Sequence, residues 1–316
     1  MSKGIPTVDL AKFNSGDEAQ RKEFIHGLGQ AFHQVGFVAV VNHGIDLDLV
    51  DHFYQSAETF FGLPKEVKSK YEIEGLAGQR GYTSFGKEHA KQSNVGDLKE
   101  FYQIGQRLPD DHASNKNYPA NVYVDEVQEF TELGDKLYRS FEESGAFLLR
   151  AIALHLGLQE SYFDEKIEYG NSILRAIHYP PITEEPESAI RAEQHEDINL
   201  ITLLVGASAG GLQLLNKQMK WSDIQPEENE IVVNVGDMLQ RLTNDYLKST
   251  THRVVNPPRE LWHTPRLSIP FFLHPKSNMD LSVLESCVTD ERPKLYEPIT
   301  AGEYLDERLR EIGLKK

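Results

Sequence analysis

Cysteine is almost absent from this sequence, because Cys287 is the single thiol among 316 residues. One cysteine excludes a disulfide within the chain and any metal site built from clustered thiolates. Its simplest role is that of a small buried side chain. Basic residues are also scarce: 33 Lys and Arg stand against 49 Asp and Glu, which gives a formal net charge of −16. Since nucleic acids and anionic membranes bind basic surfaces, we expect neither as a partner.

Long apolar runs are missing as well. No stretch approaches the length of a membrane span, and the opening Met-Ser-Lys-Gly-Ile-Pro lacks the apolar core of a signal peptide. Hydrophobic residues nevertheless make up 39% of the chain, which is ordinary for a globular protein with a core. We therefore expect a cytoplasmic protein in a reducing compartment. Nothing in the sequence indicates an oligomeric state.

The patterning divides the chain into two regions. Over residues 1–170, apolar residues recur at helical spacing after a capping-box pattern at Ser15 to Glu18, after a candidate cap at Asp46, and from about Asp125 to His155. Short strands are expected at 5–10 and 37–41. Over residues 171–316, short apolar segments alternate with Gly, Pro, Asn and Asp turns. The expected strands cover 173–179, 200–205, 212–215, 231–235, 238–242, 249–255 and 265–273.

Many short strands at this spacing predict a sandwich or a barrel. Thr300, with Glu303 three residues later, predicts a closing helix that extends to about Ile312. We see no internal repeat or linker. We therefore expect residues 1–316 to form a single unit, in which the helix-rich region packs on the stranded one.

The first candidate site is the sequence Gln194-His195-Glu196-Asp197. In an extended strand, His195 and Asp197 point to the same side while Glu196 points to the other. An imidazole and a carboxylate then converge without any loop distortion. They supply two of the three ligands of the two-His, one-carboxylate site that suits non-haem Fe(II). The motif is weak by itself, because 12 His and 49 acidic residues produce about two His-x-acid triplets by chance.

Downstream residues strengthen this interpretation. His252 is the candidate third ligand, and a rolled sheet can bring it to the first two although several strands intervene. Arg266 and Ser268 share one face of a predicted strand. An arginine among apolar residues is costly to bury without an anion, and its planar fork suits a carboxylate. Tyr179 is a candidate third contact for the same anion.

Taken in order, His195-x-Asp197, His252 and Arg266-x-Ser268 resemble the isopenicillin N synthase-like family of Fe(II)- and 2-oxoglutarate-dependent oxygenases. The likeness extends over nearly the whole chain. It includes the segments 5–10, 36–45, 60–68, 211–214, 233–240 and 248–254.

The resemblance implies a mainly β fold with α-helices, in which a double-stranded β-helix, or jelly roll, carries an N-terminal helical region and a C-terminal helix. It implies catalysis at Fe(II) held by His195, Asp197 and His252, with O2 and 2-oxoglutarate as cosubstrates. It places the far carboxylate of 2-oxoglutarate on Arg266 and Ser268. Tyr179 is a less certain contact, because the family often has Asn where this chain has Ile177.

The expected activity is oxidation of an unactivated C–H bond of a small molecule, by hydroxylation or desaturation, with release of succinate and CO2. We expect the substrate to meet the loop from Gly75 to Gly86 and the closing helix. The candidate substrate contacts are Arg80, Tyr82, Phe101, Tyr102 and Leu242.

Three other functions stay open at this point. A family oxidase without 2-oxoglutarate would use Arg266 and Ser268 for a substrate carboxylate. A catalytically silent binding protein would not need the intact ligand set. A zinc hydrolase with the same three ligands would leave Arg266 and Ser268 without a role.

Overall fold

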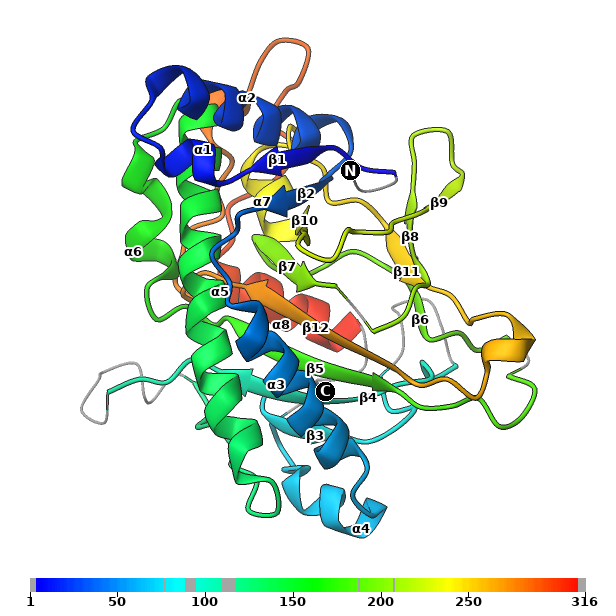
Figure 1. Cartoon of the computed structure of the whole chain (residues 1–316). Helices are drawn as coiled ribbons and strands as arrows, with labels where there is room; N and C mark the ends of the chain where they lie inside the picture. The colour runs from blue at the N-terminus through cyan, green and yellow to red at the C-terminus, as the bar shows by residue number, and fades with distance from the viewer. Residues whose placement is uncertain are drawn as a thin grey trace.

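The computed structural model describes residues 4–76, 78–88, 95–109, 118–186, 188–206 and 208–311. In these residues two sheets face each other, and helices cover the outer face of the larger sheet (Figure 1). The larger sheet has eight strands in the order β1-β2-β10-β7-β12-β5-β4-β3, and the smaller has four in the order β6-β11-β8-β9. This arrangement confirms the predicted jelly roll with its helical additions.

The strands are short, as the spacing of turn residues predicts. They are β1 (Thr7–Asp9), β2 (Phe37–Val41), β3 (Gly81–Thr83), β4 (Glu100–Gly105), β5 (Ile173–Tyr179), β6 (Ala192–His195), β7 (Ile201–Val205), β8 (Leu212–Leu215), β9 (Trp221–Asp223), β10 (Ile231–Val235), β11 (His252–Val254) and β12 (Arg266–Leu273). Apart from the parallel pair β1–β2, neighbouring strands run antiparallel.

The helices lie mostly in the first half of the chain. They are α1 (Ala11–Asn14), α2 (Glu18–Gln34), α3 (Leu47–Phe61), α4 (Lys65–Lys68), α5 (Gln128–His155), α6 (Asp164–Ile167), α7 (Asp237–Leu242) and α8 (Ala301–Glu311). Asp46 caps α3 as predicted, by accepting hydrogen bonds from two backbone N–H groups of the first turn. Thr300 and Glu303 form the predicted capping box of α8. Ile312, where we expected α8 to end, lies outside the described residues.

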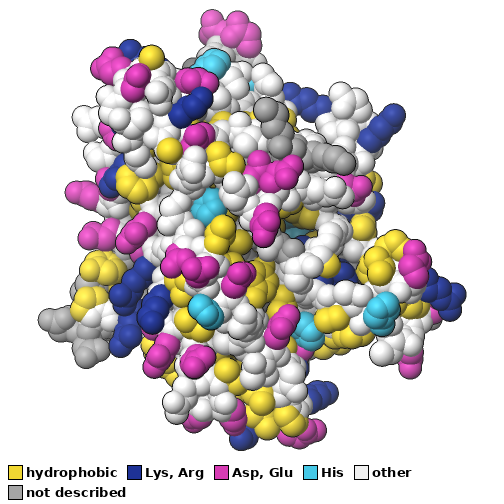
Figure 2. Space-filling model, in the orientation of Figure 1, with side chains coloured by type: hydrophobic (Ala, Val, Ile, Leu, Met, Phe, Trp, Pro, Cys, Tyr) yellow, Lys and Arg dark blue, Asp and Glu magenta, His cyan; other side chains and the backbone are white. Residues whose placement is uncertain are grey.

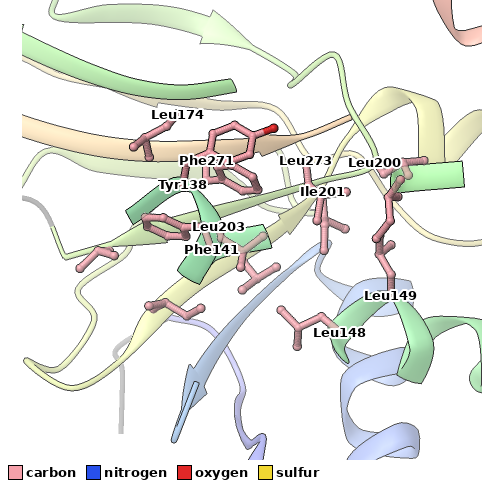
Figure 3. Close-up of a cluster of buried hydrophobic side chains, with 14 of the residues drawn as sticks. Tyr138, Phe141, Leu148, Leu149, Leu174, Leu200, Ile201, Leu203, Phe271 and Leu273 are labelled. Carbon is pink, nitrogen blue, oxygen red and sulfur yellow. The ribbon is translucent and has the colours of Figure 1, made fainter. Parts of the chain in front are cut away.

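The main core forms where α5 crosses the larger sheet. One face of α5 presents Tyr138, Phe141 and Leu148 to strands β5, β7 and β12 (Figure 3). Phe141 is fully buried and stacks on Phe271 of β12 at a centroid distance of 5.4 Å. The apolar stripe predicted for this helix is therefore core packing.

A second core lies between the two sheets. It joins Phe37 and Val232 of the larger sheet to Leu214 and Val254 of the smaller. Phe37, Val232 and Val254 of this core also line a cavity of about 860 Å³ between the sheets. The interior of the jelly roll is therefore part packed core and part binding site.

The surface carries acidic and basic side chains side by side, with magenta and blue atoms both spread over the visible face (Figure 2). Within the described part of the chain, the helices are all too short or too polar to cross a membrane.

Three segments differ from the predictions. Residues 238–242 form helix α7 instead of a strand, because Met238, Leu239 and Leu242 are buried together at helical spacing. Residues 81–83, which we expected in a glycine-rich loop, form edge strand β3 and pair with β4. Helix α2 is capped by Asp17, whose side chain accepts from Ala19 and Gln20, and not by the predicted box at Ser15.

Candidate metal centre and cavity

Two neighbouring strands of the smaller sheet bring the three predicted metal ligands together. His195 ends β6 and His252 begins β11, and the two residues are direct partners in the antiparallel register. Asp197 follows β6 by two residues. Its Oδ1 lies 3.9 Å from His195 Nε2 and 3.7 Å from His252 Nε2. All three ligand atoms lie within 4.8 Å of one another, a spacing that one metal ion can bridge.

Hydrogen bonds on the far side of each ligand fix its orientation. His195 Nδ1 lies 2.6 Å from the carbonyl oxygen of Glu193, and His252 Nδ1 lies 3.1 Å from that of Thr250. Both bonds require Nδ1 to carry the proton, which leaves Nε2 as the lone-pair donor toward the centre. Such outer contacts set the tautomer and the ring orientation of metal-binding histidines.

The carboxylate of Asp197 is held in the same way. Its Oδ2 accepts hydrogen bonds from Thr202 Oγ1 at 2.6 Å and from Asn234 Nδ2 at 2.8 Å. Thr202 of β7 and Asn234 of β10 are register partners on the inward face of the larger sheet. Both side chains are buried, so Oδ1 alone is left to face the histidines. Sequence reasoning missed this pair, although each is a polar residue within an apolar strand.

The charge states in the centre suit a metal ion. Burial alone would raise the pKa of Asp197, but His252, His195 and the two hydrogen bonds outweigh it and hold that pKa below its usual range. Burial and the neighbouring His252 lower the pKa of His195. Both shifts favour the deprotonated forms of these groups, which are the forms that bind metals.

The donor set fits non-haem Fe(II). Two imidazole nitrogens and one carboxylate oxygen leave coordination positions open for exogenous ligands. Among the described residues this is the one group of at least three His, Cys, Asp or Glu side chains with ligand atoms close enough for a shared ion.

An anion-binding end lies in the same cavity. Arg266 of β12 is the register partner of Tyr179 on β5, and both side chains line the cavity with Ser268. The Arg266 guanidinium lies 5.0 Å from the centre of the Tyr179 ring and donates from Nε to the carbonyl oxygen of Ala209 at 2.9 Å. Its Nη1 is buried and has no hydrogen-bond partner among the described residues. A buried cation with a free donor fits the carboxylate of a bound acid.

The five predicted substrate contacts do not line this cavity. Arg80 is 1% exposed and donates to Gln106 Oε1. Tyr82 is buried in the main core and donates a hydrogen bond to Glu100 Oε2. Tyr102 donates to the carbonyl oxygen of Val122 at 2.6 Å and belongs to the helix-side core.

Phe101 and Leu242 are also covered by other residues. Phe101 faces the interior, but the Arg175 guanidinium lies over its ring at 4.2 Å. Leu242 ends α7 within the main core. A direct contact between these five residues and a substrate stays a prediction that their positions do not favour.

The cavity wall on β4 and β5 instead carries a group of residues that sequence reasoning missed. Glu88, Asp97, Lys99 and Arg175 line the cavity together with Gln103. Each is an ordinary polar residue in the sequence. The pairing of β4 with β5 brings Gln103 beside Arg175, and the segment before β4 adds Glu88, Asp97 and Lys99.

Comparisons with known proteins agree with this geometry. Residues 5–126 match the family model described as the N-terminal part of non-haem dioxygenases in morphine synthesis, and residues 170–275 match the 2OG-Fe(II) oxygenase superfamily. The 2-oxoglutarate-Fe(II) type oxidoreductase hxnY of Emericella nidulans is 31% identical over 93% of this chain and 86% of its own. Flavanone 3-dioxygenase 2 of Oryza sativa subsp. japonica is 33% identical over 95% and 82%.

Solved structures show the same relationship. A 2OG-Fe(II) oxygenase family protein from Caulobacter crescentus is 41% identical and superimposes with a TM-score of 0.88, covering 98% of this chain and 99% of its own. Neurospora crassa T7H, in complex with alpha-KG (2-oxoglutarate) and thymine, is 33% identical with a TM-score of 0.85, covering 97% and 96%.

The chain therefore belongs to the Fe(II)- and 2-oxoglutarate-dependent oxygenases. As a member of this family it oxidises an unactivated C–H bond of a small molecule with O2, and 2-oxoglutarate is converted to succinate and CO2. The alternative of an oxidase that takes no 2-oxoglutarate is not favoured, since the relatives are named for that cosubstrate.

Proposed function

We propose that His195, Asp197 and His252 hold the Fe(II) of this oxygenase, and that Arg266, Ser268 and Tyr179 hold the far carboxylate of 2-oxoglutarate. The observation that carries the first part is the convergence of three lone-pair atoms whose opposite sides are already hydrogen-bonded. The observation that carries the second is the unpartnered Nη1 of Arg266, which is buried in the same cavity.

Each side chain has a defined task in this proposal. Thr202 and Asn234 hold Asp197 so that one oxygen reaches the metal while the other stays occupied. Arg266 orients 2-oxoglutarate by its far end and leaves the 2-oxo acid end for the metal. When bound, the Fe(II) supplies the activation of O2 that oxidises the substrate.

We propose further that residues 1–316 act as a single oxygenase unit in the cytoplasm on a free small molecule. Strand β2 of the first region pairs with β10 of the second, and α5 packs on β5, β7 and β12, which supports a single unit. The formal net charge of −16 favours a small molecule as the substrate over a nucleic acid or a membrane surface. The complex of the Neurospora relative with thymine supports a substrate of that size.

Iron loading tests the ligand assignment. Under anaerobic conditions the wild-type protein is expected to bind one equivalent of Fe(II), and Asp197→Ala is expected to lose iron and activity together. Glu196→Gln is the matched control, because the Glu196 carboxylate bonds the Thr251 hydroxyl and takes no part in the cluster of ligand atoms. Full iron occupancy in Asp197→Ala would contradict the assignment.

A further inference from the structure

The cavity wall formed by β5 and the loop before β4 contains a buried ion network of Glu88, Asp97, Lys99 and Arg175. Lys99 Nζ lies 2.8 Å from Glu88 Oε1 and 2.7 Å from Asp97 Oδ2. Arg175 Nη1 donates to the two oxygens of Glu88 at 3.2 and 3.3 Å. All four side chains are 15% exposed or less. The network therefore pairs two cations with two carboxylates inside the cavity.

The Arg175 guanidinium is held rigidly within this wall. Its Nε donates to Gln103 Oε1 at 3.1 Å, and Gln103 is its register partner on β4. Its plane lies near the rings of Phe101 and Phe272, at 4.2 and 5.2 Å from their centres. These contacts occupy Nε and Nη1, while Nη2 has no partner among the described residues. Arg175 thus presents a fixed donor group in a cavity that also holds the metal centre.

Glu88 and Lys99 hold each other in their charged forms. Burial alone would raise the pKa of Glu88, but Arg175 and Lys99 outweigh burial and hold that pKa at about 2. Burial alone would lower the pKa of Lys99, but Glu88 and Asp97 raise it above its usual range. Burial lowers the pKa of the neighbouring His274 to about 3, so that imidazole is neutral.

Arg175 has a carboxylate partner in the cavity wall, whereas Arg266 has none among the described residues. Four cationic side chains line the described part of the cavity: Lys99, Arg175, Arg266 and Arg308. Lys99 and Arg175 have the carboxylates of the ion network, and Arg308 is paired with Glu311 at 2.9 Å. Arg266 alone has no carboxylate partner among the described residues, and it is the one already assigned to 2-oxoglutarate. Among the described residues that line the cavity, no cation is therefore left to compensate a second bound acid.

The charges of a bound metal ion and cosubstrate also compensate each other. A divalent cation and the Arg266 guanidinium stand against a dicarboxylate and the Asp197 carboxylate. An anionic substrate would add an uncompensated buried charge to this arrangement, which costs far more than a neutral group of the same size. A neutral carbonyl oxygen, by contrast, can accept a charge-assisted hydrogen bond from Arg175 without disturbing any ion pair.

We propose that the substrate is an uncharged molecule whose amide or lactam carbonyl oxygen accepts a hydrogen bond from Arg175, and that the ion network makes Arg175 reject carboxylate substrates. This inference rests on the proposed function, because it assumes that 2-oxoglutarate occupies Arg266. Arg175 is then a specificity-determining residue, and Glu88 is the residue that positions and neutralises it.

Matched probes test the proposal. Protein loaded anaerobically with Fe(II) and 2-oxoglutarate is titrated in a calorimeter with thymine and 5-carboxyuracil, and with nicotinamide and nicotinate. The members of each pair share a ring and differ in one ionised carboxylate. In at least one pair the uncharged member is expected to bind ten- to a hundredfold more tightly, roughly the value of one hydrogen bond to a charged group. Equal binding within both pairs, including no measurable binding of any probe, or tighter binding of a carboxylate would overturn the proposal.

Two variants separate this proposal from the proposed function. Arg175→Gln is expected to weaken the uncharged probe about tenfold or more and to leave the dissociation constant of 2-oxoglutarate unchanged. Glu88→Gln leaves a cation in excess and is expected to shift the preference toward the carboxylate probe. If 2-oxoglutarate itself fails to bind the Fe(II)-loaded wild type, the proposed function fails. If 2-oxoglutarate binds normally and both variants keep the wild-type probe preference, this inference alone fails.

Discussion

Replacing Arg266 with Met removes the charge partner that we assign to the far carboxylate of 2-oxoglutarate. The side chain is 2% exposed, so the carboxylate would remain buried without compensation. Truncating one partner of a buried, hydrogen-bonded charge pair costs about 2–5 kcal/mol. Since about 1.4 kcal/mol corresponds to a factor of ten, we expect the dissociation constant of 2-oxoglutarate to rise by roughly thirty- to several-thousand-fold.

The assay is an anaerobic titration of Fe(II)-loaded protein with 2-oxoglutarate, followed by its visible charge-transfer band. Arg150→Met is the matched control, because Arg150 of α5 pairs with Asp164 of α6 and does not line the cavity. The variant also loses the bond from Arg266 Nε to Ala209, so a thermal melt must show that it is folded. A folded Arg266→Met protein with the dissociation constant of the wild type would refute the assignment.

Two further predictions concern stability. Burial and the neighbouring Glu143 raise the pKa of Glu142 to about 7 from an ordinary 4.5. The folded state therefore binds this proton more tightly than the unfolded state does. This difference stabilises the fold fully below pH 4.5, and the stabilisation is lost as the pH rises through 7. Glu142→Gln should raise the melting temperature relative to wild type at pH 8 and change it little at pH 5; an equal shift at both values would contradict this. Phe141→Ala should lower the free energy of unfolding in urea by about 3–5 kcal/mol, because the ring is fully buried against Phe271. Phe85→Ala is its control, since Phe85 is 50% exposed, and a loss in Phe141→Ala no larger than in the control would argue against the packing.

The strands that could be predicted from sequence are those with sharp chemical boundaries. Residues 173–179, 212–215 and 231–235 are mostly apolar segments with Gly, Pro or Glu at one boundary or both, and they match β5, β8 and β10. Helix α7 was misread because the short run Met238–Leu242 fits either period, and only burial of Met238, Leu239 and Leu242 together decides for a helix.

Strand β3 escaped prediction for another reason. Gly81 adopts a φ of +74°, and a Cβ there would lie 2.4 Å from the carbonyl oxygen of Tyr71. Glycine is therefore required at the start of this strand, while in the sequence it indicates a loop. The sequence pattern therefore does not indicate β3, because the pairing of this edge strand with β4 is set by tertiary contacts.

The proximity of His195 and Asp197 could be predicted because alternation along an extended chain places them on one side, and the shared face of Arg266 and Ser268 on β12 follows in the same way. The residues that hold Asp197 could not, since Thr202 and Asn234 lie in separate strands and meet only through the register of β7 and β10. The charged residues of the cavity wall could not be predicted either. Glu88 and Lys99 are unremarkable charges along the chain, and only their shared burial makes them part of a site.

The most direct test of the whole account is a crystal structure of the protein grown without oxygen in the presence of Fe(II) and 2-oxoglutarate, with the iron located by its anomalous scattering. We expect one anomalous peak bonded to His195 Nε2, Asp197 Oδ1 and His252 Nε2, and a dicarboxylate that extends from it to Arg266. An anomalous peak at other side chains, or a dicarboxylate that does not reach Arg266, would contradict the account.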